Sequence, residues 1–163
     1  MQFVFLSPGF YSAHVGDAEI EQKATRPHAR VLLPVEGVVF AIPFRSNIQH
    51  PYAYLTDKEN KCGLDYSKAV PVIDAATEID NTAVPHIRQN EFNALKGKDR
   101  NIEIGMRRYL RCYQKAKENP DNKRNAKILE CSTLKYFDDV LPDVLKKIEI
   151  AEATENTTEA QVS

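Results

Sequence analysis

Four polar side chains with useful chemistry, Arg45, Ser46, Asn47 and His50, directly follow the apolar run at residues 38–44. The Arg45 guanidinium is a planar fork of donors suited to a phosphate. Ser46 and Asn47 can donate to phosphate oxygens, and His50 can move a proton near neutral pH. These residue types predict a site that holds an anion. The alternative is an ordinary polar turn with one hydrogen-bonded histidine.

A second candidate is Lys68, which directly precedes the apolar stretch at residues 69–73. If this region is one extended strand, alternation places Tyr66 and Lys68 on one face and Ser67 on the other. A strand lysine beside a phosphate would stabilise developing negative charge. The alternative is a solvated lysine that discourages pairing at a sheet edge. The residues alone leave both interpretations open.

The middle of the chain is basic, although the formal net charge of the whole is only -1. Residues 88–136 contain 13 Lys and Arg against 6 Asp and Glu, whereas the segments 1–87 and 137–163 are both net acidic. A local positive surface attracts polyanions whatever the total charge. A solvated helical face is the alternative. Four of these cations share a predicted helix, three of them in one stripe with the fourth beside it: Arg107, Arg111, Lys115 and Arg108.

Metal sites and disulfides have little support in the sequence. Cys62, Cys112 and Cys131 are odd in number and widely spaced, without the CxxC or Cys/His spacing of a zinc site. The carboxylates between residues 65 and 80 are not spaced as the pair that a two-metal nuclease needs. We therefore expect neither a metal nor a cofactor.

Targeting segments are not evident either. The first ten residues lack the basic start of a signal peptide, and no run of ~18 apolar residues is present for a membrane span. We expect a cytoplasmic protein with no membrane partner.

The elements that must position these residues begin with short strands. Apolar and β-branched runs bounded by Pro, Gly and polar turns predict strands in the first half of the chain. Two of the runs are joined by a turn at residues 35–37 and predict a β-hairpin. A later run at 126–131 is interpreted as a last strand. The predicted strands of the first half lie at 2–6, 29–44, 52–55 and 64–74.

Helices dominate the second half. Apolar residues recur at helical spacing over 101–118, Ser132 is a candidate N-cap for a helix to residue 137, and Pro142 suits the start of another helix. We predict one α+β domain over 1–150, with a small, strongly bent, barrel-like antiparallel sheet and packed helices in the C-terminal half. The polar, acidic segment 151–163 is predicted to be a disordered tail.

The segments "VVFAIPFRSNIQHPYAYLT" and "GLDYSKAVPVID" together resemble the toxins of type III toxin–antitoxin systems. These proteins form the ToxN/AbiQ superfamily, and the chain is most similar to its TenpN branch. The shared pattern is a strand ending in a proline and a serine-containing loop, then a variable turn, then Gly-Leu and a strand that carries a lysine. The resemblance is best over residues 29–74 and only general in the basic helical region.

The resemblance implies a MazF/Kid-like β core and a metal-independent endoribonuclease activity. In such a reaction the 2′-hydroxyl of RNA attacks the adjacent phosphate and leaves a 2′,3′-cyclic phosphate. The resemblance further implies that a repeated pseudoknot RNA, which the toxin processes from a precursor, inhibits the enzyme in a closed toxin–RNA assembly. Cellular or phage RNA would be the substrate, and the role would be phage defence or plasmid maintenance.

Residue roles carried over from the family fall on the first candidate site. The family's catalytic serine aligns with Ser46, its loop threonine with Arg45, and its loop lysine with Ile48. Because isoleucine has no charge, the positive charge must come from Arg45, from Lys68 or from elsewhere in the chain. We expect Arg45 and Lys68 to hold the scissile phosphate and Ser46 to orient the phosphate or the 2′-hydroxyl. His50 is the expected proton-transfer group.

Under the same resemblance, Asn47 and the four cations of the predicted helix, Arg107, Arg108, Arg111 and Lys115, are expected to bind RNA. Two rival functions remain open. One is a non-catalytic RNA-binding module with a small barrel, and the other is a toxin of similar fold that acts on a protein.

Overall fold

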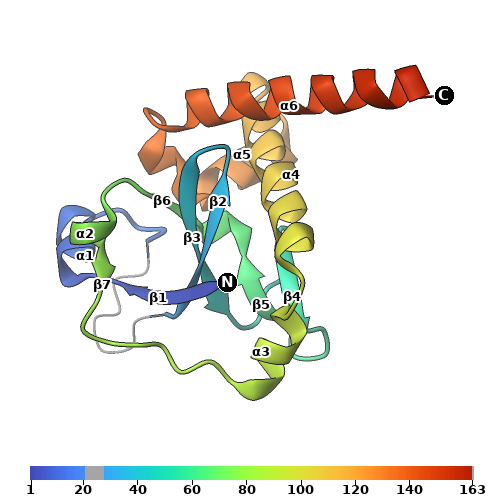
Figure 1. The fold of residues 1–163 in the computed structure, drawn as a ribbon. Coiled ribbons are helices and arrows are strands. Elements are labelled where there is room, and N and C mark those ends of the chain that lie inside the picture. The colour runs from blue at the N-terminus through green and yellow to red at the C-terminus, as the bar shows by residue number, and fades with distance from the viewer. Residues whose placement is uncertain (21–27, 163) are drawn as a thin grey trace.

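The computed structural model describes residues 1–20 and 28–162 as an α+β fold built around one antiparallel sheet (Figure 1). Its strand order is β4-β5-β3-β2-β1-β7, and β6 pairs with β3 off this path. The described strands β4 and β7 end the row without pairing with each other, so the sheet does not close into the barrel that we predicted. The strands are β1 (Gln2–Leu6), β2 (Arg30–Val35), β3 (Val38–Arg45), β4 (Ala53–Asp57), β5 (Cys62–Asp65), β6 (Val70–Val72) and β7 (Ile79–Asp80).

Most helical residues lie in the C-terminal half, as predicted. In Figure 1 the long helix α4 runs beside the sheet, and α6 crosses near its end. The helices are α1 (Pro8–Ala13), α2 (Ala75–Glu78), α3 (Gln89–Leu95), α4 (Asp99–Glu118), α5 (Lys123–Cys131) and α6 (Leu141–Val162), with 3₁₀ turns at Tyr66–Lys68 and Thr133–Phe137.

The predicted hairpin is confirmed as β2 and β3. Val35 pairs with Val38 across a two-residue turn, in which both Glu36 and Gly37 have positive φ, at 47° and 84°. Positive φ at both positions matches the twist of the flanking strands. The turn therefore fixes the register of β3 against β2, and this register sets the position of Arg45 at the end of the strand.

The predicted strand at 64–74 is wrong, because the structure breaks it into β5, a 3₁₀ turn and β6. The side chain of Asp65 caps the turn by accepting a hydrogen bond from the backbone N–H of Ser67. β5 and β6 then pair with different parts of β3. Lys68 consequently lies in the turn, and the strand alternation expected of Tyr66 and Lys68 does not apply.

Helix α4 is confirmed and packs on the sheet through the apolar residues that defined its period. Ile102, Met106 and Tyr109 are all buried in the core. At Gly105, an added Cβ would lie 2.3 Å from the hydroxyl oxygen of Tyr66, which donates a hydrogen bond to the carbonyl of Ile102 on the same helix. A larger residue at 105 would therefore have to displace the Tyr66 side chain.

Two short helices differ from the sequence prediction. The predicted strand at 126–131 is wrong and belongs to α5, which Asn122 caps through the N–H groups of Arg124 and Asn125. Helix α1 was missed, although Ser7 caps it and Pro8 occupies its first position. Ser132 is an N-cap, and the segment that it caps, Thr133–Phe137, is a 3₁₀ turn where the sequence predicts a helix. The sequence also allows a helical turn at residues 18–23, but that segment lies partly outside the described residues.

Helix α6 continues to Val162, through the segment from residue 151 that is predicted as a disordered tail. Its first half is anchored by buried apolar residues such as Leu141 and Ile148. In its second half, the hydroxyls of Thr154 and Thr158 donate to carbonyls four residues earlier, so the exposed helix extends past α4 and α5 (Figure 1). Within residues 1–20 and 28–162, none of the helices combines the length and apolar character that a bilayer crossing requires.

Candidate active site

The candidate site is organised around one buried carboxylate, Asp65, at the end of β5. Its side chain is 1% exposed, and it accepts hydrogen bonds from the Ser67 hydroxyl at 2.6 Å and the Ser67 backbone N–H at 2.9 Å. Arg45 Nη1 lies 3.3 Å from Asp65 Oδ2, and His50 Nε2 lies 3.4 Å from Asp65 Oδ1. Two side chains predicted from the sequence therefore meet at a carboxylate that the prediction left out.

The charges of the cluster keep Asp65 ionised. Burial acts to raise the pKa of its carboxyl, but hydrogen bonds from His50 and Ser67 and the charge of Arg45 outweigh burial and hold that pKa below its usual range. Arg45 and His50 are still 29% and 32% exposed. A ligand can therefore reach the guanidinium and the imidazole from solvent while the carboxylate stays covered.

Both ring nitrogens of His50 have polar partners within the protein. Nδ1 accepts the backbone N–H of Tyr52 at 3.2 Å, so a neutral ring carries its proton on Nε2, which faces Asp65. The Ser67 hydroxyl lies 3.4 Å from the same Nε2. In a serine-hydrolase triad, the hydroxyl and the carboxylate contact opposite nitrogens of the ring. The arrangement of Ser67, His50 and Asp65 is therefore not such a triad.

Lys68 approaches the cluster from the 3₁₀ turn. Its ammonium donates at 2.6 Å to the carbonyl of Cys131, the last residue of α5, where the helix dipole favours a cation. Burial lowers the pKa of Lys68, and the nearby charge of Arg45 lowers it further, against the opposing effect of Asp65. The ammonium of Lys68 therefore already has a partner at the end of α5.

The turn that carries Lys68 is fixed from two sides. The buried guanidinium of Arg30 donates to the carbonyl of Lys68 at 3.2 Å. The Thr133 hydroxyl lies 3.2 Å from the Ser67 carbonyl and 2.5 Å from the Ala69 carbonyl. These bonds replace the strand pairing that the turn lacks, so the site has a rigid backbone on this side.

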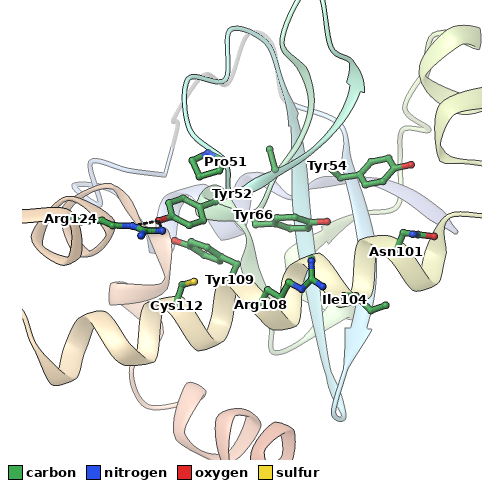
Figure 2. Close-up of a pocket in the computed structure, with 12 residues that line it drawn as sticks. Pro51, Tyr52, Tyr54, Tyr66, Asn101, Ile104, Arg108, Tyr109, Cys112 and Arg124 are labelled. Atoms are coloured by element: carbon green, nitrogen blue, oxygen red, sulfur yellow. Dashed lines mark hydrogen bonds between the residues drawn. The ribbon is translucent and has the colours of Figure 1, made fainter. Parts of the chain in front are cut away.

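A pocket of about 420 Å³ opens beside His50 and Ser67, and its wall also includes Tyr52, Tyr109 and Arg124. A second pocket of about 550 Å³ lies between β4 and α4 and shares those last three residues. Figure 2 shows this second pocket, with Tyr109 rising from α4 and Arg124 reaching the hydroxyl of Tyr52. The titratable cluster therefore stands at the end of a double cavity.

The loop residues 46–48 lie outside this cluster. Ser46 is exposed in the turn that follows β3, and none of the hydrogen bonds described for the cluster involves it. Asn47 is also exposed, has φ of 55°, and accepts a hydrogen bond from Gln49. Ile48 is buried, and its N–H donates to the carbonyl of Lys61. Ile48, at the position where the resemblance would place a lysine, therefore anchors the loop.

The predicted basic stripe on α4 divides into two kinds of residue. Arg107 contacts Glu36 and Glu103 at 2.6 and 2.9 Å. Arg111 pairs with two carboxylates of α6, Glu149 at 3.0 Å and Glu152 at 3.5 Å. By contrast, Arg108 and Lys115 are exposed, and neither forms an ion pair within the described part of the chain. The stripe is not a uniformly cationic face.

Four residues of the site escaped the sequence prediction: Asp65, Ser67, Tyr52 and Arg124. A local signal existed for the first pair, since an Asp two residues before a Ser is typical of a side chain that caps a turn. No local signal existed for Tyr52 and Arg124, which are 72 positions apart and meet through a 3.4 Å hydrogen bond.

Comparison with known proteins yields no match, whether with models of protein families, with curated proteins or with solved structures. The resemblance to the ToxN/AbiQ superfamily therefore stays a prediction. Among the described residues, no group of three or more His, Cys, Asp and Glu side chains is placed to hold a metal ion.

Proposed function

We propose that the chain is an endoribonuclease that needs no metal and the toxin of a type III toxin–antitoxin system, of the ToxN/AbiQ superfamily and its TenpN branch. The observation that supports this proposal most is the meeting of Arg45 and His50 at Asp65, beside a pocket that His50 lines, with Lys68 on the turn that Asp65 caps. RNA cleavage of this kind requires cations for one phosphate and a group that moves protons. The cluster contains both.

In the proposed reaction, RNA supplies its own nucleophile. The 2′ oxygen forms a bond to phosphorus while the bond to the 5′ oxygen breaks, and one proton leaves the 2′-hydroxyl as another reaches the 5′ oxygen. Arg45 and Lys68 hold the charge that builds up on the phosphate oxygens. Asp65 pairs with Arg45 and so holds the guanidinium in place, and its negative charge lowers the net positive charge of the cluster.

His50 is the proposed proton-transfer group. Its hydrogen bonds of 3.2 to 3.4 Å are long, and such contacts can rearrange when substrate binds. Ser46, exposed beside Arg45, is proposed to orient the phosphate or the 2′-hydroxyl.

The proposed partners follow from the same resemblance. They are a repeated pseudoknot antitoxin RNA, which the enzyme processes and which inhibits it in a closed assembly, and cellular or phage RNA as substrate. The proposed setting is the cytoplasm, with a role in phage defence or plasmid maintenance. The open antiparallel sheet with packed helices supports a MazF/Kid-like core only at the level of the α+β class.

Incubation of purified protein with single-stranded RNA in EDTA tests this proposal. We expect RNA fragments that end in 2′,3′-cyclic phosphate. Arg45→Ala is expected to abolish cleavage without unfolding the protein, whereas the matched Arg100→Ala, an exposed arginine on α4, should cleave as the parent does. If the folded Arg45→Ala variant keeps full activity, the assignment of the site is wrong.

A non-catalytic RNA-binding module is the second candidate. It is favoured by the protein contacts of His50 and Lys68, since both nitrogens of His50 and the ammonium of Lys68 already have partners. Under this alternative, RNA in the same incubation stays intact and bound. If the RNA stays intact and bound at every protein concentration, the chain is a binding module and not an enzyme.

A further inference from the structure

The double cavity beside the cluster has an unusual lining, in that its charged side chains are all cationic. The two pockets together present Arg108, Arg124 and Lys127, of which Lys127 pairs with Glu130 at 3.1 Å, and neither lining includes an Asp or Glu. The chain as a whole has 23 Asp and Glu against 22 Lys and Arg. A surface without carboxylates that carries several cations favours an anionic ligand.

Aromatic rings give the same cavity a second property. Tyr52 forms part of the wall of both pockets and is only half-buried. Its ring stacks on His50 with centroids 5.8 Å apart and contacts Tyr109 at 5.5 Å. Tyr54 and Tyr66 continue the aromatic wall into the second pocket (Figure 2). Flat heterocycles such as nucleobases stack on rings of this kind.

The two arginines of the cavity are not neutralised. Arg124 donates to the hydroxyl of Tyr52 at 3.4 Å, a long bond to a neutral group. Arg108 points from α4 toward the tyrosines (Figure 2), and no ion pair of Arg108 occurs among the described residues. Arg107 and Arg111, on the same helix, are each paired with two carboxylates. The helix therefore keeps one arginine available on the side that faces the cavity.

We infer that this cavity binds unpaired nucleotides of a single-stranded RNA next to the linkage held by the cluster. One base stacks on Tyr52, while Arg124 and Arg108 contact the backbone phosphates of the flanking nucleotides. The position of the cleaved linkage in this inference rests on the proposed function, in which His50 acts at that linkage. His50 and Tyr52 line the same pocket, and their rings stack. Bases paired in a duplex cannot enter, so the site selects single strands.

Binding of a short fluorescent oligoribonucleotide with 2′-O-methyl groups throughout tests the inference without any cleavage, because the methylated oxygen cannot attack the phosphate. Tyr52→Ala is expected to weaken binding about 5- to 150-fold, the range for the loss of one base stack, whereas Tyr52→Phe keeps the ring and should lose less than about 3-fold. A duplex of the same sequence is expected to bind much more weakly than the single strand.

Arg108→Ala provides a test that does not disturb packing, because this side chain is exposed. The slope of log affinity against log salt should fall by about 0.7, the value for one lost contact to single-stranded RNA. Arg100→Ala, exposed on the same helix and outside both pockets, should leave the slope unchanged.

The outcomes separate this inference from the proposed function. If the chain does not cleave RNA but loses binding in folded Tyr52→Ala and Arg108→Ala, the pocket stands and the nuclease does not. If the chain cleaves RNA while both variants bind and cleave as the parent does, the pocket inference is wrong and the nuclease stands. Equal affinity for duplex and single strand would also overturn the inference.

Discussion

Cationic side chains gather in two regions, around Asp65 and along α4, and the carboxylates of the two regions are arranged differently. At the cluster, one buried carboxylate is shared by Arg45 and His50, and Lys68 lies on the turn that Asp65 caps. Along α4, two arginines meet four carboxylates, Glu36, Glu103, Glu149 and Glu152. Cations therefore outnumber carboxylates at the cluster, whereas each of these two arginines faces a pair of carboxylates.

This difference shows that the charge of a segment alone does not tell which of its cations are available to an anion. Residues 88–136 have the largest surplus of Lys and Arg in the sequence, yet Arg107 and Arg111 stabilise the contacts of α4 with the hairpin turn and with α6. The cluster lies in the acidic first half of the chain. Where an anion can bind depends on which cations lack carboxylate partners, and that is a property of the fold.

The largest expected effect comes from removing the arginine of the cluster. Replacing Arg45 with alanine should lower the rate of RNA cleavage by about 10²- to 10³-fold, the usual cost of losing one donor to a transition-state charge. The measurement is single-turnover cleavage at saturating protein. The far-ultraviolet circular dichroism of the variant should match the parent, and a loss smaller than about 10-fold would contradict a role for Arg45 at the phosphate.

The two regions should also differ in stability. Asp65→Asn should lower the free energy of unfolding by about 3 kcal/mol, because it leaves buried donors and a guanidinium without their anion. Glu103→Gln on α4 should cost under about 1 kcal/mol, as partly exposed ion pairs do. Urea unfolding at pH 7 measures both, and equal costs would remove the distinction between the regions.

Acid should reveal the same carboxylate. The pKa of Asp65 is lower in the folded protein than the value near 3.9 of an unfolded chain. Its contribution to stability is therefore complete above about pH 4 and is lost as pH falls through the folded pKa. Urea unfolding at a series of acidic pH values should show a smaller loss in Asp65→Asn than in the parent. Parallel curves for the two proteins would contradict this assignment.

Alkaline pH tests Lys68 in a similar way. Because burial and Arg45 lower its pKa, Lys68 loses its proton below the usual lysine value near 10.4. Cleavage should then decline on the alkaline side of the pH–rate profile as the phosphate loses one cation. Lys68→Arg should shift that decline to higher pH, since guanidinium stays protonated. Lys58→Arg, an exposed control on the β4–β5 turn, should not shift it.

The smallest expected effect concerns the paired arginines of α4. Replacing Glu149 and Glu152 together with glutamine releases Arg111 from α6. RNA binding should strengthen by a few fold, and the salt slope should steepen by about 0.7 for one added phosphate contact. Unchanged affinity would mean that pairing with α6 is not what limits RNA contact along this helix.

Local patterns in the sequence predicted the hairpin and α4, because turn chemistry and a 3.6-residue period depend on neighbours in the chain. The run at 126–131 was assigned to a strand because a short apolar run suits either element. The strand at 64–74 failed because the cap that Asp65 forms was overlooked. α6 continues where a tail was expected, since its anchors, among them Ile148, act through tertiary packing.

The candidate site shows the same limit. Arg45, His50 and Lys68 are predictions from residue type and from the family resemblance, and the first two contact Asp65 in the structure. Asp65 itself carries no such signal, because a carboxylate repels phosphate and its cationic partners are brought to it only by the fold. The partners of Arg107 and Arg111 are equally hidden, since Glu36 and Glu149 lie 71 and 38 positions away along the chain.

The central claim is that the cluster holds one linkage while the adjacent 2′-hydroxyl attacks it. The most direct measurement uses an RNA oligonucleotide with one 2′-deoxy nucleotide at a mapped cleavage position, incubated with the protein in EDTA. The account predicts that the substituted position stays uncut, while the oligonucleotide binds as before and is cut at its other positions. Unchanged cleavage at the substituted position would contradict it.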